Sequence, residues 1–495
     1  MATQDTINVT IRGGAKICVP DSIALLTPYV LLEQEDWFED EVRFVRRLLR
    51  PGMTAIDVGA SFGIFSMAMA NAVGPQGSVW AFEPTPGTAE FLEATLARNG
   101  ARQVTLTRAA LSERAGTVQF VTNPNSEVNA VAKPGEAGDA IVTVPSLTLD
   151  QAGADFGWRD VDFVKLDVEG HELQVIAGGR SFFTQTSPLV MFEIKAGADV
   201  DLRPLAPFQA MGYAFYRLVP GPMLLAPVAS GEALDGFTLN LFACKADRAQ
   251  RLAADGFLAA GDSVAVAPAK GAWRNYLDSA LYARELAGGW PSKPGLFAAS
   301  HTKTYFQALA LFAQSRDSQC GATVHLALLQ KAADLAATAL QERNTLPRLL
   351  TSARLTSELG QRTSAVELLA SAGKRVQAED ASVYNEPFLA PSARYERLAT
   401  GAPADEWVHC AVVEQWERLR FFSSFYAGTS SLPLLEAIAK LPYRSPEMER
   451  RRQLIRMRAG MQAGFEASPL VSQQSDEHLN PALWAARVKP REAAK

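Results

Sequence analysis

The stretch that decides the fold reads Met53-Thr-Ala-Ile-Asp57-Val-Gly59-Ala-Ser-Phe-Gly63-Ile-Phe65. It begins with an apolar run typical of a buried strand, continues through a turn that contains two glycines, and ends at the start of a helix. Glycine has no Cβ, so such a turn lets a ligand approach the backbone closely. The stretch predicts a strand, turn and helix that bind a nucleotide-like cofactor.

The charge beside this turn distinguishes two kinds of cofactor. A dinucleotide would place its pyrophosphate over the turn and favour a third glycine near position 61, which is Ser61 here. The carboxylate of Asp57 would repel that anion, but it would attract the sulfonium and ammonium groups of S-adenosylmethionine. The turn, including Ala60, therefore favours S-adenosylmethionine, and a dinucleotide oxidoreductase remains a less favoured alternative.

The next strand also ends on an acid, in the run Val79-Trp-Ala-Phe-Glu83-Pro84. In this topology a carboxylate at the end of the second strand accepts hydrogen bonds from both ribose hydroxyls of an adenosyl group. We therefore expect Glu83 and Pro84 to bind the cofactor.

A third charged strand end follows in Val161-Asp-Phe-Val-Lys165-Leu-Asp167-Val-Glu169-Gly-His171-Glu172. In an extended chain Lys165, Asp167 and Glu169 would project to one side. Three charges at one strand end are costly unless they meet a ligand or each other. At the carboxyl ends of parallel strands, this pattern indicates a functional site.

The motifs DVGASFG, FEPTP, AALSE, KLDVEGHE and FEI, in this order and spacing, resemble the FkbM-type family of S-adenosylmethionine-dependent methyltransferases over about residues 35–245. There are two departures, both conservative in size and polarity. Ser61 stands where the family usually has Asn, and the family's EPNP is Glu83-Pro-Thr-Pro86. Most members methylate hydroxyls of sugars and other hydroxylated natural products, so the resemblance implies a glycan or small-molecule acceptor of that class.

The resemblance also implies roles for particular residues. Those expected near the adenine are Ala110, Leu111 and Ser112, and those expected to face the transferring methyl group are Asp167, Glu169, His171 and Glu193. A hydroxyl must lose its proton as it is methylated, so Asp167 and His171 are the candidate bases, and Lys165 could orient a carboxylate or hold a substrate oxygen. The three carboxylates Asp167, Glu169 and Glu193 could instead bind a divalent cation, but their spacing is not diagnostic and no metal is assigned.

Short β-branched runs alternate with helical runs between about residues 35 and 245, which predicts a doubly wound, mostly parallel, seven-stranded Rossmann-like methyltransferase sheet. Strands are expected at 54–59, 78–83, 104–111, 161–168, 189–194, 213–218 and 238–244. Helices are expected at 35–49, 64–73, 86–99, 171–183 and 203–211. Residues 1–34 read as a β-hairpin lead-in, and 123–140 as a mobile loop between the β-rich runs 117–122 and 141–145.

From residue 246 to 495 the β signal fades, and helix-length blocks predict an all-α C-terminal domain with a loose tail. Its aromatic residues between 384 and 426 are interpreted mainly as core, with an acceptor platform as the alternative. The arginine run at 450–452, with Arg456 and Arg458, is interpreted as a solvated helix face, with binding of an anionic glycan or lipid headgroup as the alternative. A second alternative for the whole chain is a non-catalytic S-adenosylmethionine-binding scaffold that uses this domain.

Composition limits the remaining choices. The 495 residues carry a net charge of -5, which gives no general attraction to nucleic acid. No signal peptide or transmembrane segment of about 18 apolar residues is apparent, and the four cysteines lie far apart, so we expect a cytoplasmic protein with reduced, mostly buried thiols. Assembly into a homo-oligomer is compatible with this organisation.

Overall fold

The computed structural model describes residues 5–121, 130–131, 141–195, 197, 200–229, 231–261, 264–291, 300–378, 385–401, 404–461, 471 and 481–488. The chain divides into two compact units. The first comprises Met1–Leu218 and Leu225–Leu258, and the second comprises Val219–Leu224 and Ala259–Lys495.

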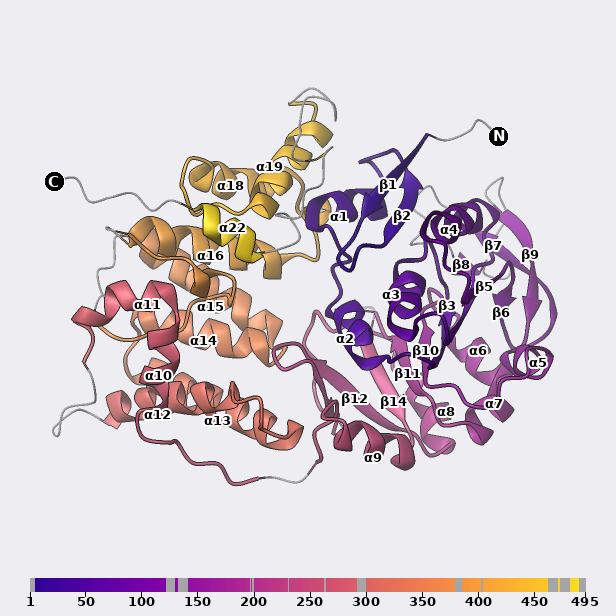
Figure 1. Ribbon diagram of the computed structural model, residues 1–495, viewed down its shortest axis with the longest axis horizontal. Helices are drawn as coiled ribbons and strands as arrows, with labels where there is room; N and C mark the ends of the chain where they lie inside the picture. The colour runs from indigo at the N-terminus through magenta and orange to yellow at the C-terminus, as the bar shows by residue number, and fades with distance from the viewer. Residues whose placement is uncertain are drawn as a thin grey trace. The chain divides into compact units, whose positions relative to one another are not determined.

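The first unit is built on an eight-stranded sheet with the strand order β13-β12-β14-β11-β10-β3-β4-β5 (Figure 1). The bounds are β3 Thr54–Val58, β4 Ser78–Phe82, β5 Val104–Thr107, β10 Phe163–Leu166, β11 Leu189–Glu193, β12 Ala214–Val219, β13 Leu224–Pro227 and β14 Asn240–Cys244. Strands β5, β4, β3, β10 and β11 are parallel, while β14 is antiparallel to both β11 and β12. The predicted Rossmann-like fold is confirmed, with β13 as an eighth strand at the edge.

The strand predicted at 104–111 is in fact two. Strand β5 ends at Thr107, and Ala110–Leu111 (β6) joins a second sheet with the order β6-β9-β7-β8. The other strands are β7 Gly116–Val121, β8 Ala130–Val131 and β9 Ile141–Leu147. Apart from β8, the loop predicted at 123–140 lies outside the described residues.

The amino-terminal hairpin is confirmed as β1 (Thr6–Thr10) paired with β2 (Lys16–Pro20). Helix α1 (Leu26–Gln34) follows it and was not predicted. The helix predicted at 35–49 is wrong at its start, because Glu35 caps α1 in a left-handed conformation (φ 55°) and α2 begins only at Asp40, ending at Leu48. Residues 35–39 therefore form a non-helical segment.

Helices cover the large sheet on both faces (Figure 1). They are α3 Ile64–Val73, α4 Pro86–Asn99, α5 Leu149–Asp155, α6 Glu172–Gly178, α7 Arg180–Gln185, α8 Leu205–Ala210 and α9 Ala246–Ala254. One face of the sheet packs against α6, α7 and α8 through Ile176, Phe183 and Phe208. On α2, Phe44 contacts Phe242 of β14 edge to face, with ring centroids 5.4 Å apart. This packing holds the carboxyl ends of β3, β4, β10 and β11 along one edge.

The described part of the second unit is helical, as predicted. Its helices are α10 Ala272–Ser279, α11 Leu281–Leu286, α12 Ser300–Ser315, α13 Ala322–Glu342, α14 Leu346–Glu358, α15 Arg362–Gln377, α16 Asp405–Arg420, α17 Ser424–Ala427, α18 Leu432–Ile438, α19 Pro446–Arg458 and α22 Pro481–Arg487. Helix α12 packs on α13, and α14 on α15. No helix among the described residues meets the length and hydropathy needed to span a bilayer.

Two interpretations of this unit can be checked. The solvated face predicted at 450–452 is wrong for Arg450 and Arg451, which are 2% and 1% exposed. Arg451 is held inside by carboxylates, lying 3.9 Å from Glu417 and 3.8 Å from Glu447. The aromatic side chains of Phe388, Tyr395 and Trp407 are fully buried, so the core interpretation is confirmed for them. It is wrong for Tyr426, which is 53% exposed, and Tyr384 lies outside the described residues.

The four cysteines are free thiols, as expected. Cys18, Cys244 and Cys410 are buried, whereas Cys320 is partly exposed.

Candidate active site

The turn after β3 uses three residues with positive φ, which are Gly59 (80°), Ser61 (47°) and Gly63 (90°). A Cβ on Gly59 would lie 1.9 Å from the carbonyl oxygen of Asp167, and one on Gly63 would lie 2.5 Å from Cδ1 of Leu92. The positive φ favours glycine at both positions, and at Gly59 the backbone of Asp167 also leaves no room for a Cβ. Close approach of a ligand, the reason expected from the sequence, is therefore not the only reason for glycine in this turn.

Asp57, on β3, lies fully buried beneath this turn. The hydroxyl of Ser66 donates to its Oδ2 at 2.6 Å, while its Oδ1 has no hydrogen-bond partner. Burial raises the pKa of Asp57, and the nearby ammonium group of Lys165 opposes that rise. The carboxyl group of Asp57 is therefore buried under the turn, with the ammonium group of Lys165 favouring its ionised form.

Lys165, on β10, connects the turn to the next strand ends. Its Nζ donates to the carbonyl oxygen of Gly59 at 3.1 Å, and lies 3.1 Å from Oδ2 of Asp167 and 3.7 Å from Oδ1 of Asp57. Burial alone would lower the pKa of Lys165, but the carboxylates of Asp167 and Asp57 outweigh that effect and raise it. Of the two roles expected for Lys165, this geometry matches the one that orients carboxylates.

Glu83 follows β4 and is also buried. The backbone N–H of Ser61 donates to its Oε2 at 3.0 Å, and the backbone N–H of Thr85 donates to its Oε1 at 2.9 Å. Burial raises the pKa of Glu83, and these two backbone hydrogen bonds lower it. Each carboxylate oxygen can accept a second hydrogen bond, so the ribose role expected for Glu83 is compatible with its structural one.

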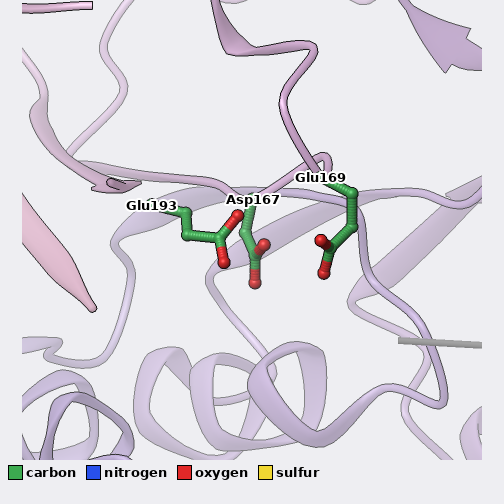
Figure 2. Close-up of side chains that lie close together, drawn as sticks. All are labelled: Asp167, Glu169 and Glu193. Carbon is green, nitrogen blue, oxygen red and sulfur yellow. The ribbon is translucent and has the colours of Figure 1, made fainter. Parts of the chain in front are cut away.

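Asp167, Glu169 and Glu193 bring their carboxylates together, as Figure 2 shows, from the segment after β10 and from the last residue of β11. One oxygen from each side chain lies within 4.8 Å of the others. Glu169 reaches this cluster from a left-handed turn (φ 54°), so the extended alternation predicted for Lys165, Asp167 and Glu169 is wrong at its last member. Three converging oxygens could also hold a divalent cation, so that alternative stays open.

The pKa values reflect this crowding of carboxylates. Burial raises the pKa of Glu193 to about 9 and that of Glu169 to about 8, and the charge of Asp167 adds to both shifts. Lys195 lies 3.8 Å from Glu169 and opposes its shift. Near neutral pH this site therefore holds protons as well as negative charge.

His171 begins the helical turn beside this cluster. Its Nε2 lies 2.9 Å from Oγ of Ser112, so the structure brings together one residue expected at the adenine and one expected at the methyl group. Burial lowers the pKa of His171, which favours the neutral ring. Glu172 Oε1 accepts the backbone N–H groups of Val168 and Gly170 and fixes the turn between Asp167 and His171.

The remaining residues of the expected adenine group, Ala110 and Leu111, form β6 and are buried. They precede Ser112 directly, so the expected group is continuous along one short strand and its end.

Two further polar residues, Asn240 and Glu39, belong to the site but were not predicted from the sequence. Asn240 of β14 faces Glu193 across the antiparallel pair, and its Nδ2 donates to Oε2 of Glu39 at 2.8 Å. Burial raises the pKa of Glu39 to about 7, and the charge of Asp167 contributes to that shift. For Glu39, the acidic and aromatic run 35–41 could have indicated a role in the site, but the apolar spacing of this region predicts the start of a helix instead.

Comparisons with known proteins concern the part of the chain that contains this site. Residues 57–214 match the model of the methyltransferase FkbM domain. The chain is 31% identical over 153 residues to the methyltransferase sdnD of Sordaria araneosa, covering 25% of this chain and 59% of that protein. It is 30% identical over 143 residues to the hexuronic acid methyltransferase AglP of Haloferax volcanii, covering 29% of this chain and 56% of that protein. The chain thus spans less than two thirds of either curated relative.

Among solved structures, the chain is similar to an S-adenosylmethionine-dependent O-methyltransferase from Thermotoga maritima at 17% identity and a TM-score of 0.26, covering 49% of this chain and 77% of that one. A precorrin-6y C5,15-methyltransferase from Geobacter metallireducens is 16% identical to this chain with a TM-score of 0.26, and the match covers 42% of this chain and 88% of that one. Scores this low support no conclusion about function. The family match over residues 57–214 and the two curated relatives nevertheless agree with the motifs, and all three matches are to methyltransferases.

Proposed function

We propose that the chain is an S-adenosylmethionine-dependent O-methyltransferase that transfers a methyl group to a hydroxyl of a saccharide or a related hydroxylated metabolite. The observation that carries this proposal is the position of the carboxylate cluster within an FkbM domain. It lies directly beside the buried acidic turn, to which Lys165 connects it.

The residues present fit S-adenosylmethionine better than a dinucleotide. Asp57 is buried with one carboxylate oxygen that has no hydrogen-bond partner, and Asp167 lies on the other side of Lys165. One buried lysine between two carboxylates leaves negative charge near the turn, which favours a cationic ligand and disfavours pyrophosphate. We assign Asp57, Glu83 and the turn of Gly59, Ala60, Ser61 and Gly63 to the cofactor, together with Pro84, the two residues of β6 (Ala110–Leu111) and Ser112.

Transfer to oxygen requires a base and a positioned acceptor. When bound, S-adenosylmethionine supplies an electrophilic methyl group on sulfur and leaves as a neutral thioether. Asp167 would accept the hydroxyl proton as the new carbon–oxygen bond forms, and Lys165 holds its carboxylate in place at 3.1 Å. His171, neutral because of its lowered pKa, is the second candidate for that proton.

The acceptor class rests on relatives and on chemistry. One relative is named as a hexuronic acid methyltransferase, which supports a saccharide acceptor for this chain. Glu169, Glu193 and Glu39 offer carboxyl groups that can hydrogen-bond hydroxyls near the proposed base.

The experiment is a transfer assay with methyl-labelled S-adenosylmethionine, the full-length chain, and a panel of nucleotide sugars and glycans, with Asp167→Asn as the inactive control. The proposal expects labelled product from at least one hydroxylated acceptor and almost none from the variant. Cofactor binding without turnover on any hydroxylated acceptor would favour the scaffold alternative instead.

A further inference from the structure

The segment Trp37–Glu39, which precedes α2, lies beside the proposed active site. The indole N–H of Trp37 donates to Oε1 of Glu39 at 2.8 Å, and the side-chain amide of Asn240 donates to Oε2 at 2.8 Å. Both oxygens of Glu39 are therefore fixed in position. Asn240 is paired in register with Glu193, so this segment is connected to the carboxylate cluster through one residue.

The segment also presents aromatic rings. The rings of Trp37 and Phe38 lie 4.4 Å apart between centroids at an angle of 32°, and both side chains are only partly buried. Adjacent aromatic and carboxylate groups suit a polyhydroxylated ring, because its C–H face can pack on an aromatic face while its hydroxyls donate to carboxylate oxygens.

We infer that Trp37, Phe38 and Glu39, together with Glu193 and Asn240, form the acceptor subsite, and that this subsite selects an uncharged pyranose ring over a uronic acid. The inference rests on the proposed function, since it names the acceptor of that same reaction. It differs from the activity given in the name of the Haloferax volcanii relative.

The selection against uronic acids follows from charge. Glu39, Asp167, Glu169 and Glu193 gather at this edge of the sheet. The two lysines beside them are already engaged, Lys165 by Asp57 and Asp167, and Lys195 by Glu169. A carboxylated ring would bring another negative charge to a place where burial, with the charge of Asp167 adding to it, already disfavours the ionised form of the carboxyl groups, whereas a neutral ring brings none.

The test is saturation-transfer NMR on the full-length chain saturated with S-adenosylhomocysteine. The probes are methyl glycosides of glucose, mannose, galactose and rhamnose, compared with those of glucuronic and galacturonic acid. We expect at least one neutral glycoside to bind about tenfold or more tightly than every uronate.

Four variants assign the binding to this segment. Trp37→Ala and Glu39→Gln should weaken the neutral glycoside about tenfold, whereas Trp37→Phe, which keeps an aromatic ring, should weaken it less than Trp37→Ala does. Glu90→Gln, at an exposed position on α4, is the matched control and should change nothing. Equal affinity of each variant for S-adenosylmethionine shows that the fold is intact.

The outcomes separate this inference from the proposed function. Uronates that bind as tightly as neutral glycosides, absence of binding by every neutral glycoside, or unchanged binding in both Trp37→Ala and Glu39→Gln would each overturn the inference. In all three cases S-adenosylmethionine still binds. Loss of S-adenosylmethionine binding by the wild-type chain would overturn the proposed function itself.

Discussion

Replacing Lys165 with Met should destabilise the first unit strongly, because the variant leaves two carboxylates without their counter-charge. The lysine is 3% exposed and Asp57 is fully buried. Lys165 lies 3.7 Å from Asp57 and 3.1 Å from Asp167, and donates to the carbonyl oxygen of Gly59. Removing one partner of a buried ion pair costs about 3 to 5 kcal/mol. Asp167 has a partly exposed side chain and can recover hydration, so we expect about 3 kcal/mol for Lys165→Met.

The pH dependence of this loss has a definite sign. The pKa of Asp57 is already raised by burial, and removing the ammonium group raises it further. At about pH 5 the variant can protonate Asp57 and avoid a buried charge, whereas at about pH 8 it cannot do so as readily. The destabilisation should therefore be larger at the higher pH.

The assay is urea denaturation of the full-length chain, followed by circular dichroism at both pH values. Lys16→Met, at an exposed position on β2, is the control and should stay within about 0.5 kcal/mol of wild type. The double variant Asp57→Asn with Lys165→Met should be less destabilised than the two single losses added together. A Lys165→Met protein as stable as wild type at pH 8 would refute this reasoning.

Other predictions follow from the same geometry. Asp167→Asn or His171→Ala should reduce the rate of methyl transfer roughly a hundredfold with little change in cofactor affinity. A chelator should not change the rate of the wild type. Inhibition by the chelator that added magnesium reverses would support the carboxylate–cation alternative instead. Because the pKa of Glu193 is raised to about 9, the wild type loses stability as pH rises from the ordinary range of Glu towards that value. In calorimetric melting, the melting temperature of Glu193→Gln relative to wild type should therefore be higher at pH 8 than near pH 4. The same difference in melting temperature at both pH values would contradict the raised pKa of Glu193.

The elements with strong local patterns were predictable from the sequence. One apolar, β-branched run ends near Asp57 and another near Glu83, and each is followed by apolar residues at helical spacing. These local patterns predict both strands and the helix that follows each of them. Their place in the sheet follows from the alternation of strands and helices. The helical character of the chain beyond residue 246 was predictable for the same reason, and α13 (Ala322–Glu342) is one of the helices found there.

The contacts that complete the site depend on tertiary packing and were not predictable locally. The need for glycine at position 59 arises from the carbonyl oxygen of Asp167, more than a hundred residues later in the chain. Glu39 joins the cluster only because β14 places Asn240 beside Glu193. Arg450 and Arg451 appear solvated in the sequence because a run of arginines does not reveal the buried acids that surround it.

The central claim is most directly tested by calorimetric titration of the full-length chain with S-adenosylmethionine, with NAD, and with S-adenosylmethionine on Glu83→Ala. The account predicts micromolar binding of S-adenosylmethionine, no binding of NAD, and a loss of about 1.5 to 3 kcal/mol in the variant, because hydrogen bonds to a charged acceptor are removed. Binding of NAD in place of S-adenosylmethionine would contradict the account, and unchanged affinity in Glu83→Ala would contradict the assignment of Glu83 to the ribose.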